Sequence, residues 1–331
     1  MTKRQAFRRS LLRWFRCHGR DLPWRHTRDP YAVLVSEVML QQTQVATVRS
    51  YYIDWLNRFP NFAALARASE NDVLHAWQGL GYYARARNLH ATAKFVQNRH
   101  HGRFPRDIDA MRQLPGIGKY SAHAIASFAF NQPAPIVEAN TARVLARLFA
   151  LQRPIDSATG RRHLWRYATE LVAKGNPADF NSALVDLGAL VCLPRKPKCE
   201  ICPVKIFCRA THPESLPIKK SRLATKHLSE AHAFLTKNSA ILLQRADHRW
   251  RGMWILPPLK LHRLNRSSPP RAVYRSVFPF THYRVTLRVF PGEVRKIDSR
   301  KKRWFSLHEL ESIPIPSPHR RAIDSLLSRQ C

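Results

Sequence analysis

The sequence predicts a mainly helical amino-terminal part that is followed by a smaller α/β domain. Up to about residue 213, apolar residues recur at spacings of three and four, which is the period of an amphipathic helix. Beyond about residue 227, short runs alternate in period two, as β-strands do. The stretch 214–226 contains Pro217 and several Lys and Arg residues, which is typical of a linker. We therefore expect a helical part at 1–213, a linker at 214–226 and an α/β domain at 227–331.

Individual elements follow from the same patterns. One helix face is formed by the apolar residues Val45, Val48, Tyr52, Trp55 and Phe59. Ser69 with Asp72 three residues later resembles a helix start, and apolar residues follow at Val73, Leu74 and Trp77. In the second part we expect strands at 240–244 and 283–289 and a closing helix at 317–327.

The charge of the chain predicts a polyanionic partner. Lys and Arg number 56 against 22 Asp and Glu, a net charge of +34 that is spread over both parts. Such an excess is typical of nucleic-acid binding, although ribosomal and membrane-surface proteins share it. No apolar run reaches the roughly 18 to 20 residues of a membrane span. We expect a protein with no membrane contact, located in the cytoplasm at the bacterial nucleoid, or in a eukaryotic nucleus or mitochondrion.

Four cysteines form a compact cluster with the spacing C-x6-C-x2-C-x5-C: Cys192, Cys199, Cys202 and Cys208. Thiolates this close repel one another unless a metal neutralises them. Four-cysteine zinc sites usually consist of two close pairs, whereas an iron–sulfur cluster tolerates uneven spacing. The spacing leaves both open and favours iron–sulfur slightly. Cys17 and Cys331 lie outside the motif, and we expect them to be ordinary thiols.

A glycine-rich turn is predicted in the run Leu114-Pro115-Gly116-Ile117-Gly118, which precedes Lys119 and a long apolar stretch. The two glycines allow a tight turn with positive φ between two helices. The N–H groups that begin the second helix could then bind a phosphate. A purely structural turn between helices is the alternative.

An acidic residue, Glu37, lies inside the apolar helical stretch 33–40. Burial raises the pKa of a carboxyl group, so that it can hold a proton near neutral pH and act as a general acid. The alternative is a structural glutamate paired with an arginine.

Taken with these motifs, the run Ser36–Val45 resembles the adenine DNA glycosylase (MutY) family of the endonuclease III superfamily. Further matching runs are Pro23-Trp24-Arg25, Asp29-Pro30-Tyr31 and Gly79–His90. The resemblance covers most of the first 210 residues. It implies a helix-hairpin-helix glycosylase with a six-helix module at about 29–133. It also implies a second module, from 1–28 and 134–213, that carries a 4Fe-4S cluster on the four cysteines.

The resemblance also implies roles for single residues. Glu37 matches the residue that protonates the departing adenine. Gln42 and Tyr82 match residues that wedge into the base stack. The residues of the hairpin match the DNA-binding ones: Leu114, Gly116, Gly118 and Lys119.

Glu138 matches the second carboxylate, with Asn140 beside it. The family has Asp at this position, usually followed by Gly-Asn, whereas this chain has Glu138-Ala139-Asn140. The implied role is to stabilise the positive charge on the sugar. The longer side chain means either a shifted backbone or weaker activity, and a plain helix-terminal acid is the alternative.

Tyr120 bears on the type of reaction. Endonuclease III carries a lysine at the matching position, whose amine forms a Schiff base and cleaves the strand. Tyrosine cannot do this, so we expect a monofunctional glycosylase. The resemblance implies that Tyr120 hydrogen-bonds the second carboxylate.

The second part resembles, more weakly, the Nudix-like lesion-recognition domain of the family. The matching runs are Gly252–Pro257 and Phe280-Thr281-His282, of which the latter resembles a loop that contacts 8-oxoguanine. The R-E-x-x-E-E core of Nudix hydrolases does not occur in the sequence, so we expect no nucleotide hydrolysis.

These observations predict an adenine glycosylase that acts as a monomer on double-stranded DNA containing adenine opposite 8-oxoguanine or guanine. One alternative is an endonuclease III-like glycosylase and lyase for oxidised pyrimidines. The other is a non-catalytic DNA-binding protein on the same scaffold.

Overall fold

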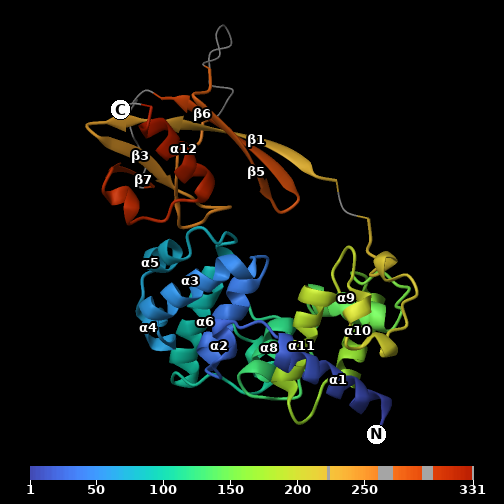
Figure 1. The fold of residues 1–331 in the computed structure, drawn as a ribbon. Coiled ribbons are helices and arrows are strands. Elements are labelled where there is room, and N and C mark those ends of the chain that lie inside the picture. The colour runs from blue at the N-terminus through green and yellow to red at the C-terminus, as the bar shows by residue number, and fades with distance from the viewer. Residues whose placement is uncertain (222–223, 260–270, 293–300, 330–331) are drawn as a thin grey trace. The chain divides into compact units, whose positions relative to one another are not determined.

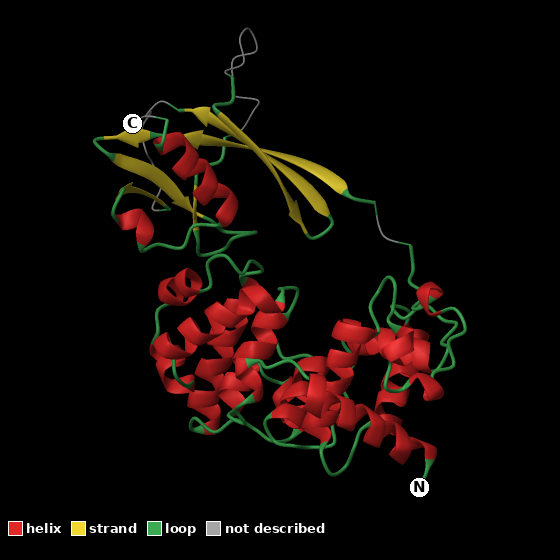
Figure 2. Cartoon of the chain, viewed as in Figure 1, coloured by secondary structure: helices red, strands yellow, loops and turns green. Residues whose placement is uncertain are grey.

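The structure is a computed structural model that describes residues 1–221, 224–259, 271–292 and 301–329. Helices dominate the amino-terminal part and strands the carboxy-terminal part, as the sequence predicts (Figures 1 and 2). The first part contains α1 (Lys3–His18), α2 (Pro30–Leu40), α3 (Val45–Arg58), α4 (Phe62–Arg67), α5 (Glu70–Ala76), α6 (Ala84–His100), α7 (Ile108–Arg112), α8 (Lys119–Phe128), α9 (Ala139–Leu148), α10 (Ala158–Leu171) and α11 (Pro177–Asp186). No helix in the described ranges is long and apolar enough to cross a membrane.

The chain divides into two compact units. The first consists of 1–66 and 91–221, and the second of 67–90 and 222–331. The division does not follow the order of the sequence, because the short segment around α5 belongs with the carboxy-terminal part.

The first unit is built around α2, which contacts both α3 and α8. Asp29 caps this helix by accepting from the N–H groups of Tyr31 and Ala32. Nine of the eleven α2 residues are buried, so α2 is a core helix rather than an amphipathic one. A second core joins α1 to the chain from 142 to 204 through Phe7, Leu11, Leu145, Phe180 and Leu184.

The second unit combines α5 with two sheets and a terminal helix. β1 (Lys226–Phe234) pairs in parallel with β6 (Tyr283–Pro291), which pairs antiparallel with β5 (Tyr274–Phe280). In the other sheet, β3 (Ala240–Arg245) pairs antiparallel with β2 (Thr236–Lys237), β4 (Trp254–Ile255) and β7 (Lys302–Ser306). The helix α12 (Ser317–Leu327) buries four of its residues: His319, Ala322, Ile323 and Leu326.

Close contacts hold the segment 67–90 in this unit. The backbone N–H of Ile315 donates to the side chain of Gln78, and the ring of His75 bonds the carbonyl of Glu311 at 2.7 Å. Gly252 has φ +86, and a Cβ atom at this position would lie 2.7 Å from Glu70 Oε1. Glycine is therefore required here by both backbone conformation and space.

The helices and strands that we predicted from residue periodicity and capping motifs are confirmed. α3 contains the predicted apolar face except Phe59, which is its C-cap. Ser69 caps α5 by accepting from the N–H of Asp72, and α12 covers the predicted closing helix. The predicted strands correspond to β3 and β6, which extend one and two residues further.

Candidate functional site

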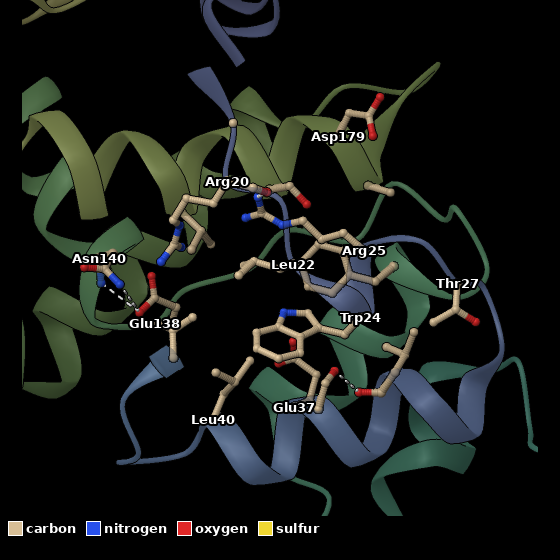
Figure 3. A pocket seen from close by; sticks show the side chains of 18 of the residues that line it. Arg20, Leu22, Trp24, Arg25, Thr27, Glu37, Leu40, Glu138, Asn140 and Asp179 are labelled. Atoms are coloured by element: carbon tan, nitrogen blue, oxygen red, sulfur yellow. Dashed lines mark hydrogen bonds between the residues drawn. The ribbon is translucent and has the colours of Figure 1, made fainter. Parts of the chain in front are cut away.

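A pocket of about 980 Å³ in the first unit brings together five of the residues singled out from the sequence. Glu37 and Gln42 come from α2 and the loop after it, Tyr120 from α8, and Glu138 and Asn140 from the start of α9. Figure 3 shows Glu37 and Leu40 on α2, with Glu138 and Asn140 across the pocket. Leu22 and Trp24 supply apolar side chains to the lining.

Glu37 is buried in the core of α2, with 7% of its surface exposed. Burial raises the pKa of this carboxyl group from its ordinary 4.5 to about 7, and the nearby Glu138 charge adds to the rise, while a hydrogen bond from Tyr120 opposes it. Glu37 is therefore able to hold a proton near neutral pH, which is the property required of a general acid.

Tyr120 interacts with both carboxyl groups of the pocket. A hydrogen bond links it to Glu37, and the charge of Glu138, the partner that the resemblance implies, also acts on its hydroxyl group. Burial, followed by the charges of Glu37 and Glu138, raises the pKa of Tyr120 well above its ordinary value. Tyr120 therefore stays neutral and keeps a proton to donate. It is the second residue of α8, and the packing of α8 on α2 is what directs it to Glu37.

Glu138 is the N-cap of α9. Its carboxylate accepts from the backbone N–H groups of Asn140 and Thr141, both at 2.8 Å. The alternative of a helix-terminal acid thus describes its local structure correctly, and the same side chain also lines the pocket. Burial raises its pKa, although both hydrogen bonds and the charge of Arg143 act in the opposite direction.

A chain of hydrogen bonds connects this carboxylate to the cysteine loop. The Asn140 amide donates to Glu138 at 3.3 Å, and Arg143 Nη2 donates to Asn140 Oδ1 at 2.9 Å. Arg143 Nε donates in turn to the carbonyl of Cys192 at 2.8 Å. Our reading of the sequence did not single out Arg143. Its position three residues after Asn140, on one face of the same helix, was the available indication.

The four cysteines lie together at the edge of the second core. Cys192 and Cys202 pack against that core, and Arg147 Nη1 lies 3.3 Å from Cys192 Sγ. Burial, reinforced by the three neighbouring thiols, raises the pKa of Cys202 to about 11. In the described part of the chain, no three Cys, His, Asp or Glu side chains converge on a single metal-ion position. Among the two remaining thiols, Cys17 is exposed, and Cys331 lies outside the described residues.

Two arginines that line the pocket, Arg20 and Arg25, are paired with a buried carboxylate that we did not predict. Asp186 is fully buried, and its two oxygens contact the guanidinium groups of Arg20 and Arg25 at 2.7 Å. Burial works against ionisation, but hydrogen bonds and charge from Arg25, with those of Arg20, lower the pKa of Asp186 below its ordinary value. No sequence pattern joins residues so far apart. Arg20 lies two residues after α1, which packs against α11, and Arg25 ends the short helix Pro23–Arg25.

The glycine-rich hairpin joins α7 to α8, with one correction. Gly116 has φ +75, as predicted, but Gly118 has φ −89 and serves as the N-cap of α8. Gly118 has no side chain to cap the helix, so the first N–H groups of α8 make no side-chain cap bond. Leu114 is only 2% exposed and belongs to the core, whereas Lys119 is exposed and lies 4.0 Å from the ring centroid of Trp165.

Three of the remaining predicted residues, Gln42, Tyr82 and Thr281, have positive φ. Gln42 is exposed with φ +57, and Tyr82 is 44% exposed with φ +48. Tyr82 belongs to the second unit, as do Phe280, Thr281 and His282, which form the end of β5 and its turn into β6. Thr281 has φ +52. Positive φ is uncommon outside glycine and often marks functional positions.

Comparison with known proteins agrees with this geometry. Residues 35–169 match the model of the HhH-GPD superfamily, described as a base excision DNA repair protein. An adenine DNA glycosylase of Buchnera aphidicola subsp. Baizongia pistaciae is 32% identical over 341 residues, which covers 97% of each chain.

The chain belongs to the adenine DNA glycosylase family. A rat family member is 47% identical over 214 residues, which is 62% of this chain, and the human one is similar. The chain matches only 42% of the length of the rat protein and 39% of the human one.

Solved structures of glycosylases are similar to about three fifths of this family member. A thermostable thymine-DNA glycosylase is 35% identical with a TM-score of 0.58, over 62% of this chain and 95% of its own. Endonuclease III in a non-covalent DNA complex is 22% identical with a TM-score of 0.53, over 63% of this chain and 96% of its own. The second likeness concerns the fold alone.

The buried Glu37 predicts a pH-dependent stability. Because its pKa is raised in the folded chain, its contribution is fully present below its ordinary pKa of 4.5 and is lost as pH rises through about 7. The variant Glu37→Gln does not titrate. We expect it to gain stability over the wild type by about 3 kcal/mol between about pH 5 and about pH 8.

The measurement is urea unfolding of both proteins at the two pH values. The exposed Glu214→Gln is the matched control and should give no such gain. An equal difference between Glu37→Gln and wild type at both pH values would mean that Glu37 is not held in the protonated form.

Proposed function

We propose that this chain is a DNA glycosylase that hydrolyses the N-glycosidic bond of adenine opposite 8-oxoguanine or guanine in double-stranded DNA. The observation that carries the proposal is the pair of carboxyl groups in one pocket, one with a raised pKa near 7 and one held by hydrogen-bond donors. The family's name and the pocket's volume, large enough for an extruded nucleotide, support it.

Glu37 is proposed as the general acid. A protonated carboxyl group with a pKa near the working pH can give its proton to a ring nitrogen of the adenine, which makes the base a better leaving group. The hydroxyl group of Tyr120 interacts with this carboxyl group and is proposed to orient it. The apolar side chains of Leu22, Trp24 and Leu40 line the same pocket and suit a planar base.

Glu138 is proposed to stabilise the positive charge that develops on the sugar as adenine leaves. A carboxylate about 4 Å from that charge contributes roughly 4 kcal/mol at an effective dielectric constant near 20. This corresponds to about a thousandfold in rate. Burial raises the pKa of Glu138, and the backbone N–H groups of Asn140 and Thr141 together with the Arg143 charge oppose this rise and so favour the ionised carboxylate that the role requires.

The proposed DNA contacts come from exposed residues and from the charge of the chain. Gln42 and Tyr82 would wedge into the base stack, and the uncapped start of α8 with Lys119 would bind a backbone phosphate. The net charge of +34 provides the general attraction. We propose that the protein acts as a monomer.

The carboxy-terminal part is proposed as a Nudix-like lesion-recognition domain, at 227–331 after a linker at 214–226. Thr281 and His282 are exposed at the tip of the β5–β6 hairpin, which suits contact with the base opposite the adenine. This proposal gives the strained Thr281 a role in recognition rather than in chemistry.

We propose that the cysteine loop holds a 4Fe-4S cluster. The uneven C-x6-C-x2-C-x5-C spacing suits a cluster better than mononuclear zinc, whose four-cysteine sites usually consist of two close pairs. Arg147 near Cys192 Sγ would favour the thiolate form. When bound, the cluster would act as a structural cross-link of the loop, and no step of the proposed reaction passes through it.

The proposed reaction predicts a specific product. Single-turnover incubation with a duplex containing adenine opposite 8-oxoguanine should leave an abasic strand that breaks only after alkali, because Tyr120 has no amine for a Schiff base. Glu37→Gln should lower the rate by roughly a hundred- to ten-thousandfold, and the wild-type rate should fall as pH rises through about 7. Glu214→Gln should keep full activity.

The competing functions give different products in the same experiment. Nicking without alkali, trapped by borohydride, would indicate a lyase. DNA binding without excision of adenine would indicate a non-catalytic protein.

The second carboxylate is tested by two substitutions. Glu138→Gln removes the charge and should cost about a thousandfold in single-turnover rate. Glu138→Asp should keep the rate within about tenfold, because Asp is a preferred N-cap. Asp29 already caps α2 through the same pattern of N–H groups two and three residues ahead. Equal losses in both variants would mean that the longer side chain is essential, and wild-type activity in Glu138→Gln would exclude the proposed role.

The cluster is tested by metal analysis of protein isolated without oxygen. We expect about four irons and labile sulfide per chain, with loss of iron in Cys202→Ser. Cys17 is exposed and outside the loop, so Cys17→Ser is the matched control and should keep its iron. Stoichiometric zinc without iron would contradict the proposal.

A further inference from the structure

The turn between β5 and β6 is held in a conformation that its own residues disfavour. The last pair of the hairpin is Phe280 with Tyr283, which leaves Thr281 and His282 as the connection. Thr281 has φ +52, a value that a β-branched residue rarely adopts. Such a conformation persists only where the surrounding structure fixes it.

Arg249 is the side chain that contacts the base of this turn. Its guanidinium carbon lies 4.5 Å from the ring centroid of Phe280 and 5.3 Å from that of Trp250. Its Nη1 lies 2.9 Å from Glu230 Oε1. The Arg249 and Glu230 side chains are 18% and 29% exposed, so the ion pair is sheltered and differs from an ordinary surface pair.

The partners of Arg249 are themselves fixed. Glu230 lies on β1, in register with Leu287 of β6. The ring of Trp250 packs edge-on against the fully buried His319 of α12, with centroids 4.9 Å apart. Arg249 therefore connects the turn to the core of the second unit rather than to another loop.

A second contact holds the other side of the turn. The backbone N–H of Lys226, at the start of β1, donates to the carbonyl of His282 at 2.9 Å. This bond fixes the backbone at His282, while Arg249 fixes Phe280. Thr281, between them, is left with little freedom.

We propose that Arg249 is a positioning residue for base recognition: it holds the Phe280–His282 turn so that Thr281 and His282 meet the base opposite the adenine. The inference rests on the proposed function. A planar guanidinium group can stack on rings and pair with a carboxylate at once, whereas a lysine ammonium group cannot reproduce this geometry. Nothing in the mechanism of bond hydrolysis uses Arg249, so its effect is confined to discrimination.

The test compares single-turnover rates on duplexes with adenine opposite 8-oxoguanine and opposite guanine. In Arg249→Lys, the ratio of the two rates should fall about tenfold, the scale of one lost base contact, while the rate opposite guanine stays unchanged. Adding Thr281→Ala and His282→Ala should cause no further loss, because the three residues act as one unit. The exposed Arg245→Lys on the neighbouring β3 is the matched control and should keep the ratio.

Phe280→Leu removes the ring that Arg249 contacts and should lower the ratio of the two rates by a similar factor. This variant keeps the test decisive if Arg249→Lys does not fold. An unchanged ratio in both variants would overturn the inference while leaving the glycosylase assignment intact. A wild type that excises adenine from neither duplex would instead overturn the proposed function. A parallel fall in both rates would show that Arg249 only stabilises the fold.

Discussion

Burial of the Glu37 carboxyl group in an apolar helix is the constraint on which the rest of the site depends. Ionising this group where nine of eleven helix residues are buried is costly, so the pKa rises until the protonated form persists near neutral pH. The packing of α3 and α8 on α2 provides this burial, and α8 also supplies the hydroxyl group of Tyr120 as a polar partner. The same burial gives Glu37 the raised pKa that the proposed catalysis needs and lowers the stability of the folded chain at pH values where Glu37 ionises.

The second carboxylate, Glu138, is held by hydrogen bonds at a helix start rather than inside an apolar helix. Glu138 stands at a helix start, where backbone N–H groups need an acceptor and a negative charge is favoured. The same residue thus caps α9 and faces the pocket. Because Arg143 continues the hydrogen-bond chain to Cys192, the position of this carboxylate depends on how the cysteine loop is held. A structural cluster would in this way influence the site without taking part in the reaction.

The second unit holds the short turn between β5 and β6 in a strained conformation. An isolated two-residue turn with Thr at positive φ would relax. The β1 backbone contacts this turn at His282, and the Arg249 side chain contacts it at Phe280. β1 belongs to a sheet, and Arg249 packs on Trp250, which contacts His319 of α12. The segment around Tyr82, another residue with positive φ, belongs to the same compact unit although it lies far earlier in the sequence.

The sequence by itself determined the features that depend on near neighbours in the chain. The period of α3, the Ser69 cap, the alternation of β6, the acid within the apolar run of α2 and the cysteine spacing are all short-range patterns. The tertiary structure alone decided which distant side chains meet: Tyr120 with Glu37, Asp186 with Arg20 and Arg25, and Arg249 with Phe280 and Glu230. It also decided that Gly118 caps α8 with negative φ, and that the segment 67–90 joins the carboxy-terminal part. The reason is physical: a helical or strand period fixes which face a residue occupies, but the partner on that face is set by packing between elements.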